Sequence, residues 1–104
     1  RLSYFKIKIM GIGLNIFLNK KILIYGLGKS GLSTFKFLKK KSDVFLYDDF
    51  QLNFKKKNIK KNLISYSNIL KTKFDKIIIS PGIDINKCKL SKFLKKKKIK
   101  FILI

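Results

Sequence analysis

The stretch Lys21–Ser33, KILIYGLGKSGLS, decides the fold of this chain. An apolar segment over residues 22–25 runs directly into Gly26, Gly28 and Gly31, which are spaced as G-x-G-x-x-G. This spacing is typical of a first β-strand that turns tightly into a first helix. At such a turn, free backbone N–H groups and the positive end of the helix dipole face the same point. The stretch therefore predicts an anion site of the kind that holds a nucleotide phosphate.

The composition narrows the class of protein. With 104 residues the chain forms one domain at most, and a hydrophobic content of 46% is too high for a disordered polycation. Histidine is absent and Cys88 is the single cysteine, which excludes a disulfide framework and His-ligated metal sites. A lone cysteine also suits a reducing compartment, so we expect a cytoplasmic protein. The five carboxylates are all aspartates, which leaves few positions for catalytic acid–base chemistry.

The net charge of +21 raises the question of a polyanionic partner. The lysines, however, are spread through every segment of the sequence. Arginine, which reads guanine and binds phosphate through two parallel hydrogen bonds, occurs only as Arg1. Abundant Lys, Ile, Asn, Phe and Tyr is also the pattern that an AT-rich genome imposes on its proteins. We therefore expect a solvated basic surface, with no specific nucleic-acid partner and no membrane partner.

Strand and helix signals alternate along the chain, which predicts a parallel sheet. Five apolar segments read as strands: residues 22–25, 44–47, 63–66, 77–79 and 100–104. Helices are expected between the strands, over residues 30–40 and 67–71. The lysine- and asparagine-rich stretch after the second strand is expected to hold a short helix at most. A last helix is expected to have Leu90, Phe93 and Leu94 on its inner face. The expected fold class is α/β, a small Rossmann-like, doubly wound parallel sheet of about five strands. We assign it to residues 15–104, after an N-terminal extension over residues 1–14.

Two further groups of residues are expected to lie at the same edge of that sheet. Asp48 stands twenty positions after Gly28, at the end of the second expected strand. An acid here accepts hydrogen bonds from a ribose in dinucleotide enzymes, although aspartate is also an ordinary turn residue. Ser80–Ile83, SPGI, follows the fourth expected strand. If that strand neighbours the first, Ser80 brings a hydroxyl and Gly82 a close backbone to face the glycine turn; a simple Pro-Gly turn is the other interpretation.

These motifs together resemble a known family. Tyr25–Ser33 (YGLGKSGLS), Tyr47–Asp49 (YDD) and Ile79–Ile83 (ISPGI) resemble the amino-terminal domain of the Mur ligases that add D-glutamate to UDP-N-acetylmuramoyl-L-alanine in peptidoglycan synthesis. The resemblance covers residues 15–104. It implies an ATP-dependent cytoplasmic ligase in which this domain binds the UDP part of the substrate. ATP and Mg²⁺ would be bound by a central domain absent from this chain, so we expect the chain alone to be inactive.

The resemblance also assigns residues to the substrate. The expected contacts with the UDP part are the diphosphate ligands Gly28, Lys29, Ser30 and Gly31, the uracil-recognising Asp48, and the pocket residues Ser80 and Gly82. No catalytic or metal-binding residue is expected in this chain. Members of the family often follow the acid with a small polar residue and an arginine, whereas Asp49 and Phe50 stand here.

The same residues are also compatible with other functions. Gly28-Lys29-Ser30 mimics the end of an ATP-binding P-loop, but Leu23 stands where that motif requires a glycine, which excludes it. The glycine turn and Asp48 also favour an NAD(P)- or FAD-binding domain of an oxidoreductase, whereas the loop Ser80–Gly82 does not. A basic nucleic-acid-binding module is favoured by the charge alone.

Overall fold

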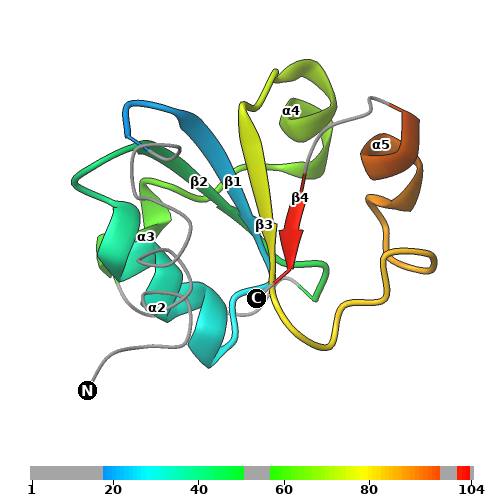
Figure 1. Ribbon diagram of the computed structural model, residues 1–104, viewed down its shortest axis with the longest axis horizontal. Coiled ribbons are helices and arrows are strands. Elements are labelled where there is room, and N and C mark those ends of the chain that lie inside the picture. The colour runs from blue at the N-terminus through cyan, green and yellow to red at the C-terminus, as the bar shows by residue number, and fades with distance from the viewer. Residues whose placement is uncertain (1–17, 51–56, 97–100, 104) are drawn as a thin grey trace.

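A parallel sheet, four-stranded in the part of the chain that the structure describes, organises the protein. The computed structural model describes residues 18–50, 57–96 and 101–103, so the expected extension over residues 1–14 lies outside the described residues. The strands are β1 (Lys21–Tyr25), β2 (Asp43–Tyr47), β3 (Lys76–Ile79) and β4 (Phe101–Leu103). They lie in the order β2-β1-β3-β4, which places β1 and β3 at the centre of the sheet (Figure 1).

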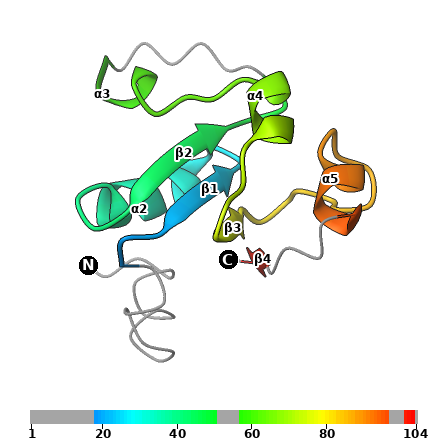
Figure 2. The same ribbon diagram turned by 90° about the horizontal axis from the view of Figure 1, so that it is seen from above.

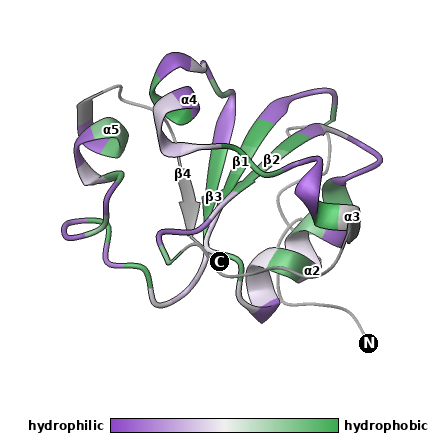
Figure 3. Ribbon diagram, turned by 180° about the vertical axis from the view of Figure 1, so that it is seen from behind, coloured by the Kyte–Doolittle hydropathy of each residue, from purple (hydrophilic) through white to green (hydrophobic). Residues whose placement is uncertain are grey.

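Strand β1 is buried on both faces. Residues Ile22–Tyr25 are all 0% exposed, and β1 pairs in parallel with β2 on one side and β3 on the other. Ile24, for example, lies between Leu46 and Ile78 in the register. A continuous apolar run without alternation is what a strand covered on both faces requires. Strand β1 and its neighbour β2 at the edge of the sheet are coloured as hydrophobic over most of their length in Figure 3.

In the described residues, four helices cover the two faces of the sheet: α2 (Lys29–Leu38), α3 (Lys57–Lys60), α4 (Tyr66–Lys71) and α5 (Ser91–Lys96). Helices α2 and α3 lie on one face and α4 and α5 on the other; Figure 2 shows α2 beside β2 and α5 on the opposite side of the molecule. Two separate apolar clusters result. One joins Phe35 and Leu38 of α2 to the sheet, and the other joins Ile69 of α4 and Leu94 of α5 to its other face. The doubly wound α/β arrangement predicted from the sequence is therefore confirmed.

The expected strand over residues 63–66 is wrong. Leu63 forms only an isolated parallel bridge with Leu46, at the outer edge of β2. The segment cannot continue as a strand because Ser65 begins a helix: its hydroxyl oxygen accepts a hydrogen bond from the Asn68 backbone N–H at 3.3 Å. The described residues thus contain four strands, and the count of about five is corrected to that number.

The remaining element boundaries differ by one or two residues from those expected. Helix α2 starts at Lys29 rather than residue 30 and ends at Leu38 rather than residue 40. It ends there because the Leu38 carbonyl accepts hydrogen bonds from the backbone N–H groups of both Lys41 and Ser42, which turns the chain toward β2. The last expected strand is present as β4, while its outermost expected residues, 100 and 104, lie outside the described residues.

Candidate functional site

The turn from β1 into α2 is built around Gly26. Its φ is +100°, which side-chain-bearing residues rarely adopt. A Cβ at this position would also lie 2.7 Å from Cδ1 of Ile83 and 2.9 Å from Cβ of Ser80. The Gly26 backbone N–H donates to the Tyr47 carbonyl at 2.8 Å, so the chain is still held to β2 as it leaves the sheet. Both the backbone conformation and the available space restrict this position to glycine.

Gly31 allows α2 to start directly behind that turn. A Cβ on Gly31 would lie 1.9 Å from the Gly26 carbonyl oxygen. Gly31 itself is buried, and it lies behind the turn with no room for a side chain. Gly28 is the opposite case: it is the N-cap of α2, it is exposed, and a Cβ there would meet nothing within 4 Å. The first turn of α2 has neither a side-chain cap nor an acidic residue, which leaves its positive end open to an anion.

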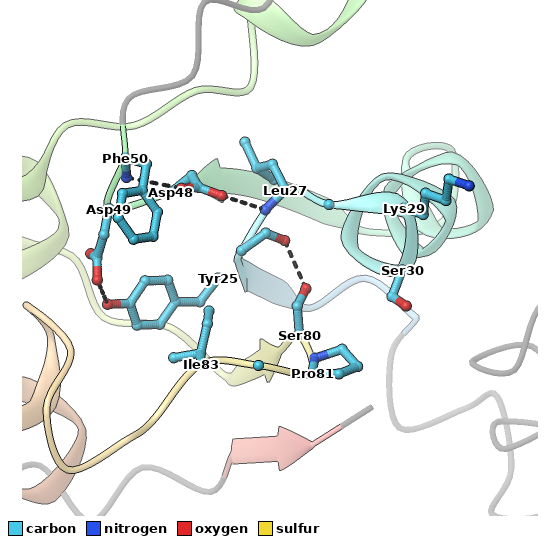
Figure 4. Close-up of a pocket in the computed structure, with 13 residues that line it drawn as sticks. Tyr25, Leu27, Lys29, Ser30, Asp48, Asp49, Phe50, Ser80, Pro81 and Ile83 are labelled. Carbon is cyan, nitrogen blue, oxygen red and sulfur yellow. Dashed lines mark hydrogen bonds between the residues drawn. The ribbon is translucent and has the colours of Figure 1, made fainter.

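Asp48 braces the glycine turn from the end of β2. Its Oδ2 accepts a hydrogen bond from the Leu27 backbone N–H at 2.8 Å, and its Oδ1 accepts one from the Phe50 backbone N–H at 2.9 Å (Figure 4). The second bond makes Asp48 a turn residue, which was one of the two interpretations left open by the sequence. The first bond is long-range and holds the glycine turn against β2. Its expected role toward uracil stays a prediction.

Ser80 holds the same turn from the end of β3. Its hydroxyl donates to the Gly26 carbonyl oxygen at 2.7 Å, and its backbone N–H donates to the Tyr25 carbonyl at 3.0 Å. Only 7% of Ser80 is exposed. Because β3 pairs with β1, the loop containing Gly82, with φ +91°, faces the glycine turn as expected (Figure 4). This loop is therefore more than a simple Pro-Gly turn.

Asp49 takes part in a hydrogen-bond network around Tyr25. The Tyr25 hydroxyl donates to Asp49 Oδ2 at 2.7 Å, and the Lys89 backbone N–H donates to the same oxygen at 3.3 Å. The Leu90 backbone N–H donates to the Tyr25 hydroxyl at 3.4 Å. Burial, followed by hydrogen bonds with Cys88 and Asp49, raises the pKa of Tyr25 far above its usual value. The network ties the end of β2 to the segment that enters α5.

These loops line an open pocket of about 330 Å³ at the carboxyl ends of β1, β2 and β3. Six of the seven expected site residues line it: Gly28, Lys29, Ser30, Asp48, Ser80 and Gly82. The seventh, Gly31, lies behind the turn and shapes the pocket indirectly. Sequence reasoning missed further lining residues, namely Tyr25, Leu27, Asp49, Phe50, Pro81 and Ile83. Each follows or precedes an expected site residue by one to three positions, and Asp49 and Phe50 had been noted only as departures from the family pattern after the acid.

The two ends of the pocket differ in charge. The open start of α2 and the exposed Lys29 make one end positive, whereas Asp48 and Asp49 make the other end negative. Such a pocket suits an elongated ligand with an anionic part and a neutral part that carries hydrogen-bond donors. Within the described ranges, no three His, Cys, Asp or Glu residues are grouped so that they could hold a metal ion. Across the same ranges, every helix is too short or too polar to cross a membrane.

Comparisons with known proteins identify related sequences. Residues 20–102 match the protein family described as Mur ligase MurD-like, N-terminal domain. The UDP-N-acetylmuramoylalanine–D-glutamate ligase of Rickettsia prowazekii is 39% identical over 75 residues, which are 69% of this chain and 17% of that enzyme. The enzyme of the same name from Rickettsia bellii is 35% identical over 69 residues, which are 64% of this chain and 15% of that enzyme.

The chain spans about a sixth of the length of these curated relatives. No solved structure gives a significant match to it. The family match covers most of the chain, including the glycine turn and the loops that follow β2 and β3. The chain therefore belongs to the family of Mur ligase MurD-like N-terminal domains.

Proposed function

We propose that the pocket binds the UDP part of UDP-N-acetylmuramoyl-L-alanine, and that the whole protein is an ATP-dependent ligase that adds D-glutamate to this substrate in the cytoplasm. One observation carries the proposal. The glycine turn, the end of β2 and the loop after β3 converge on one pocket with an open helix N-terminus at one end. The names of the relatives supply the reaction.

The positive end of the pocket suits the diphosphate. Gly28, Lys29 and Ser30 line the pocket at the start of α2, and the Lys29 side chain is exposed. Backbone N–H groups at such a helix start bind phosphate oxygens, and the lysine adds a positive charge. Gly31 contributes by allowing the helix to start this close to the turn.

The uridine is proposed to lie toward Asp48 and the loop after β3. Each oxygen of Asp48 already accepts one backbone N–H and retains capacity for another donor, such as a ring N–H. The Ser80 hydroxyl hydrogen is committed to the Gly26 carbonyl, so Ser80 offers only its oxygen as an acceptor. Gly82 brings backbone close to the ligand without a side chain.

The residues of this chain do not fit the ATP and Mg²⁺ that the ligase reaction implies. The sequence has no G-x-x-x-x-G-K-[ST] motif, and the described residues bring together no metal-ligand cluster. We assign this chain the binding and orientation of the UDP-linked substrate and derive no chemical step from it. The expected result is no ATP turnover by the chain alone in the presence of UDP-N-acetylmuramoyl-L-alanine and D-glutamate.

An NMR titration of the ¹⁵N-labelled chain tests the proposal. Addition of UDP-N-acetylmuramoyl-L-alanine should shift the amide resonances of residues 28–31, 48, 80 and 82, while NAD at the same concentration should leave them in place. Shifts with NAD alone would move the chain to the oxidoreductase class. A folded chain that responds to neither ligand would contradict both functions.

A matched pair of lysine variants tests the diphosphate end. Lys29→Gln should weaken binding of the UDP-linked substrate, because this residue lines the pocket and carries a positive charge. Lys36→Gln removes the same charge from an exposed position on the same helix, outside the pocket. Equal effects of the two substitutions would show that only the overall charge of the chain attracts the ligand, against the proposed site.

A further inference from the structure

Phe50 is an exposed aromatic residue at the pocket. Its side chain is 84% exposed, whereas the other exposed large hydrophobic residues among those described are 36% to 43% exposed. Single exposed apolar residues need no special explanation. Phe50 differs because it lines the pocket and because its backbone N–H is held by Asp48 Oδ1 at 2.9 Å (Figure 4). The backbone that carries the ring is therefore held at a defined point of the site.

The carboxylate of Asp48 links this ring to the anion end of the pocket. One of its oxygens holds the Phe50 backbone and the other holds the Leu27 backbone in the glycine turn. One side chain thus holds the backbone of the glycine turn and the backbone of Phe50 relative to each other. A ligand that reaches from one to the other must carry an anion at one end and a group suited to an aromatic face at the other.

The charges decide which group belongs at the aromatic end. Asp48 and Asp49 both line this part of the pocket, so a phosphate would be repelled there. A neutral flat ring with N–H donors is favoured, because its face can cover Phe50 while its donors face the carboxylates. Nucleotide bases have this form.

We propose that Phe50 is the stacking surface for the base of the bound nucleotide and thereby a specificity-determining residue of the site. The inference rests on the proposed function and deepens it. Phe50 stands where the resembling family often has an arginine, so recognition of the ring relies here on an aromatic face. Every base has such a face, and stacking on Phe50 therefore favours nucleotides over base-free diphosphates without choosing among bases.

Calorimetric titration of the chain with UDP and with pyrophosphate tests this role. Base–aromatic stacking predicts that Phe50→Ala raises the Kd for UDP by about 5- to 150-fold. Pyrophosphate lacks a base, so its Kd should change by less than about twofold between wild type and Phe50→Ala. Phe50→Tyr keeps the ring and should bind UDP nearly as wild type does. Tyr66→Ala removes an exposed aromatic side chain from α4, outside the pocket, and serves as the matched control.

A spectroscopic measurement separates stacking from a purely structural effect. Bound UDP should show upfield shifts of its uracil H5 and H6 resonances with wild type and Phe50→Tyr, and these shifts should be lost with Phe50→Ala. An unchanged UDP affinity for Phe50→Ala overturns the inference while leaving UDP binding in place. Equal weakening of UDP and pyrophosphate also overturns it, since the anion end would then be damaged. A folded wild type that binds no UDP overturns the proposed function together with the inference.

Discussion

Replacement of Gly31 by alanine should destabilise the domain, against the usual preference of helices for alanine. Within α2 that preference alone would favour alanine by about 1 kcal/mol. The new Cβ, however, would lie 1.9 Å from the Gly26 carbonyl oxygen and 3.0 Å from the Ser80 hydroxyl oxygen. Because ordinary contacts of this kind begin near 3.4 Å, the carbonyl must move by about 1.5 Å.

That movement has two costs. Forcing an extra methyl group into a packed site costs about 1–3 kcal/mol. The displaced carbonyl also loses the 2.7 Å hydrogen bond from Ser80, which contributes about 1 kcal/mol. After subtraction of the helix preference, the free energy of unfolding should fall by about 1–3 kcal/mol. The melting temperature of a domain of this size should fall by about 4–8 °C for each kcal/mol.

Urea unfolding followed by far-UV circular dichroism measures the change. Gly28→Ala is the matched control, because its Cβ meets nothing within 4 Å and its φ of −74° suits alanine. Its stability should change by less than about 1 kcal/mol, while its binding of UDP should weaken because the methyl group enters the proposed phosphate site. If Gly31→Ala proves as stable as wild type, or more stable, the close approach of α2 to the turn is not what restricts this position to glycine.

Three further substitutions test the contacts around the pocket. Ser80→Ala removes the donor to the glycine-turn carbonyl and should lower the free energy of unfolding by about 1 kcal/mol, so an unchanged urea midpoint would contradict the proposed brace. Asp48→Asn replaces one of two acceptor oxygens by an amide nitrogen, which cannot accept the N–H of Leu27 or Phe50; we expect a loss of about 1.5–3 kcal/mol in the same assay, and a neutral result would refute the bracing role. The raised pKa of Tyr25 means that the folded state holds the phenolic proton more tightly than the unfolded state, where the pKa is 10.0. This contribution to stability is therefore complete below pH 10 and is lost as the pH rises further, by about 1.4 kcal/mol at about pH 11. The difference in unfolding free energy between wild type and Tyr25→Phe should narrow by that amount between about pH 9 and pH 11, because lysine titration is common to both proteins; a constant difference would contradict it.

Local patterns predicted the elements whose residues carry their own signal. Continuous apolar runs gave β1 and β3, because strands buried on both faces admit few polar residues. The segment over residues 63–66 looked equally apolar at its start, yet Ser65 capped a helix in place of extending a strand. The same few residues can either extend a strand or begin a helix. The helix is favoured because Ile69 packs against the sheet, and this long-range contact cannot be read from the local sequence.

The candidate site divides in the same way. G-x-G-x-x-G, the acid after β2 and the Ser-Pro-Gly loop pointed to Gly28, Asp48, Ser80 and Gly82, because spacing along a βαβ unit determines which loops reach the same sheet edge. The other two expected residues that line the pocket, Lys29 and Ser30, came from the family resemblance. The role of Tyr25 was not predictable, since its partners Asp49 and Leu90 lie 24 and 65 positions away along the chain. Nor was Phe50 identifiable as a pocket residue, because its place depends on the turn that Asp48 makes.

Amino-acid order alone was enough to specify a parallel α/β domain with an anion site after its first strand, since strand burial and glycine spacing are local properties of the chain. Folding decided which hydrogen bonds the site residues make among themselves. Asp48 and Ser80 were expected to face the ligand, and both also hold the glycine turn from neighbouring strands. Those bonds join residues 21 and 54 positions apart, and they exist only because β2 and β3 both pair with β1.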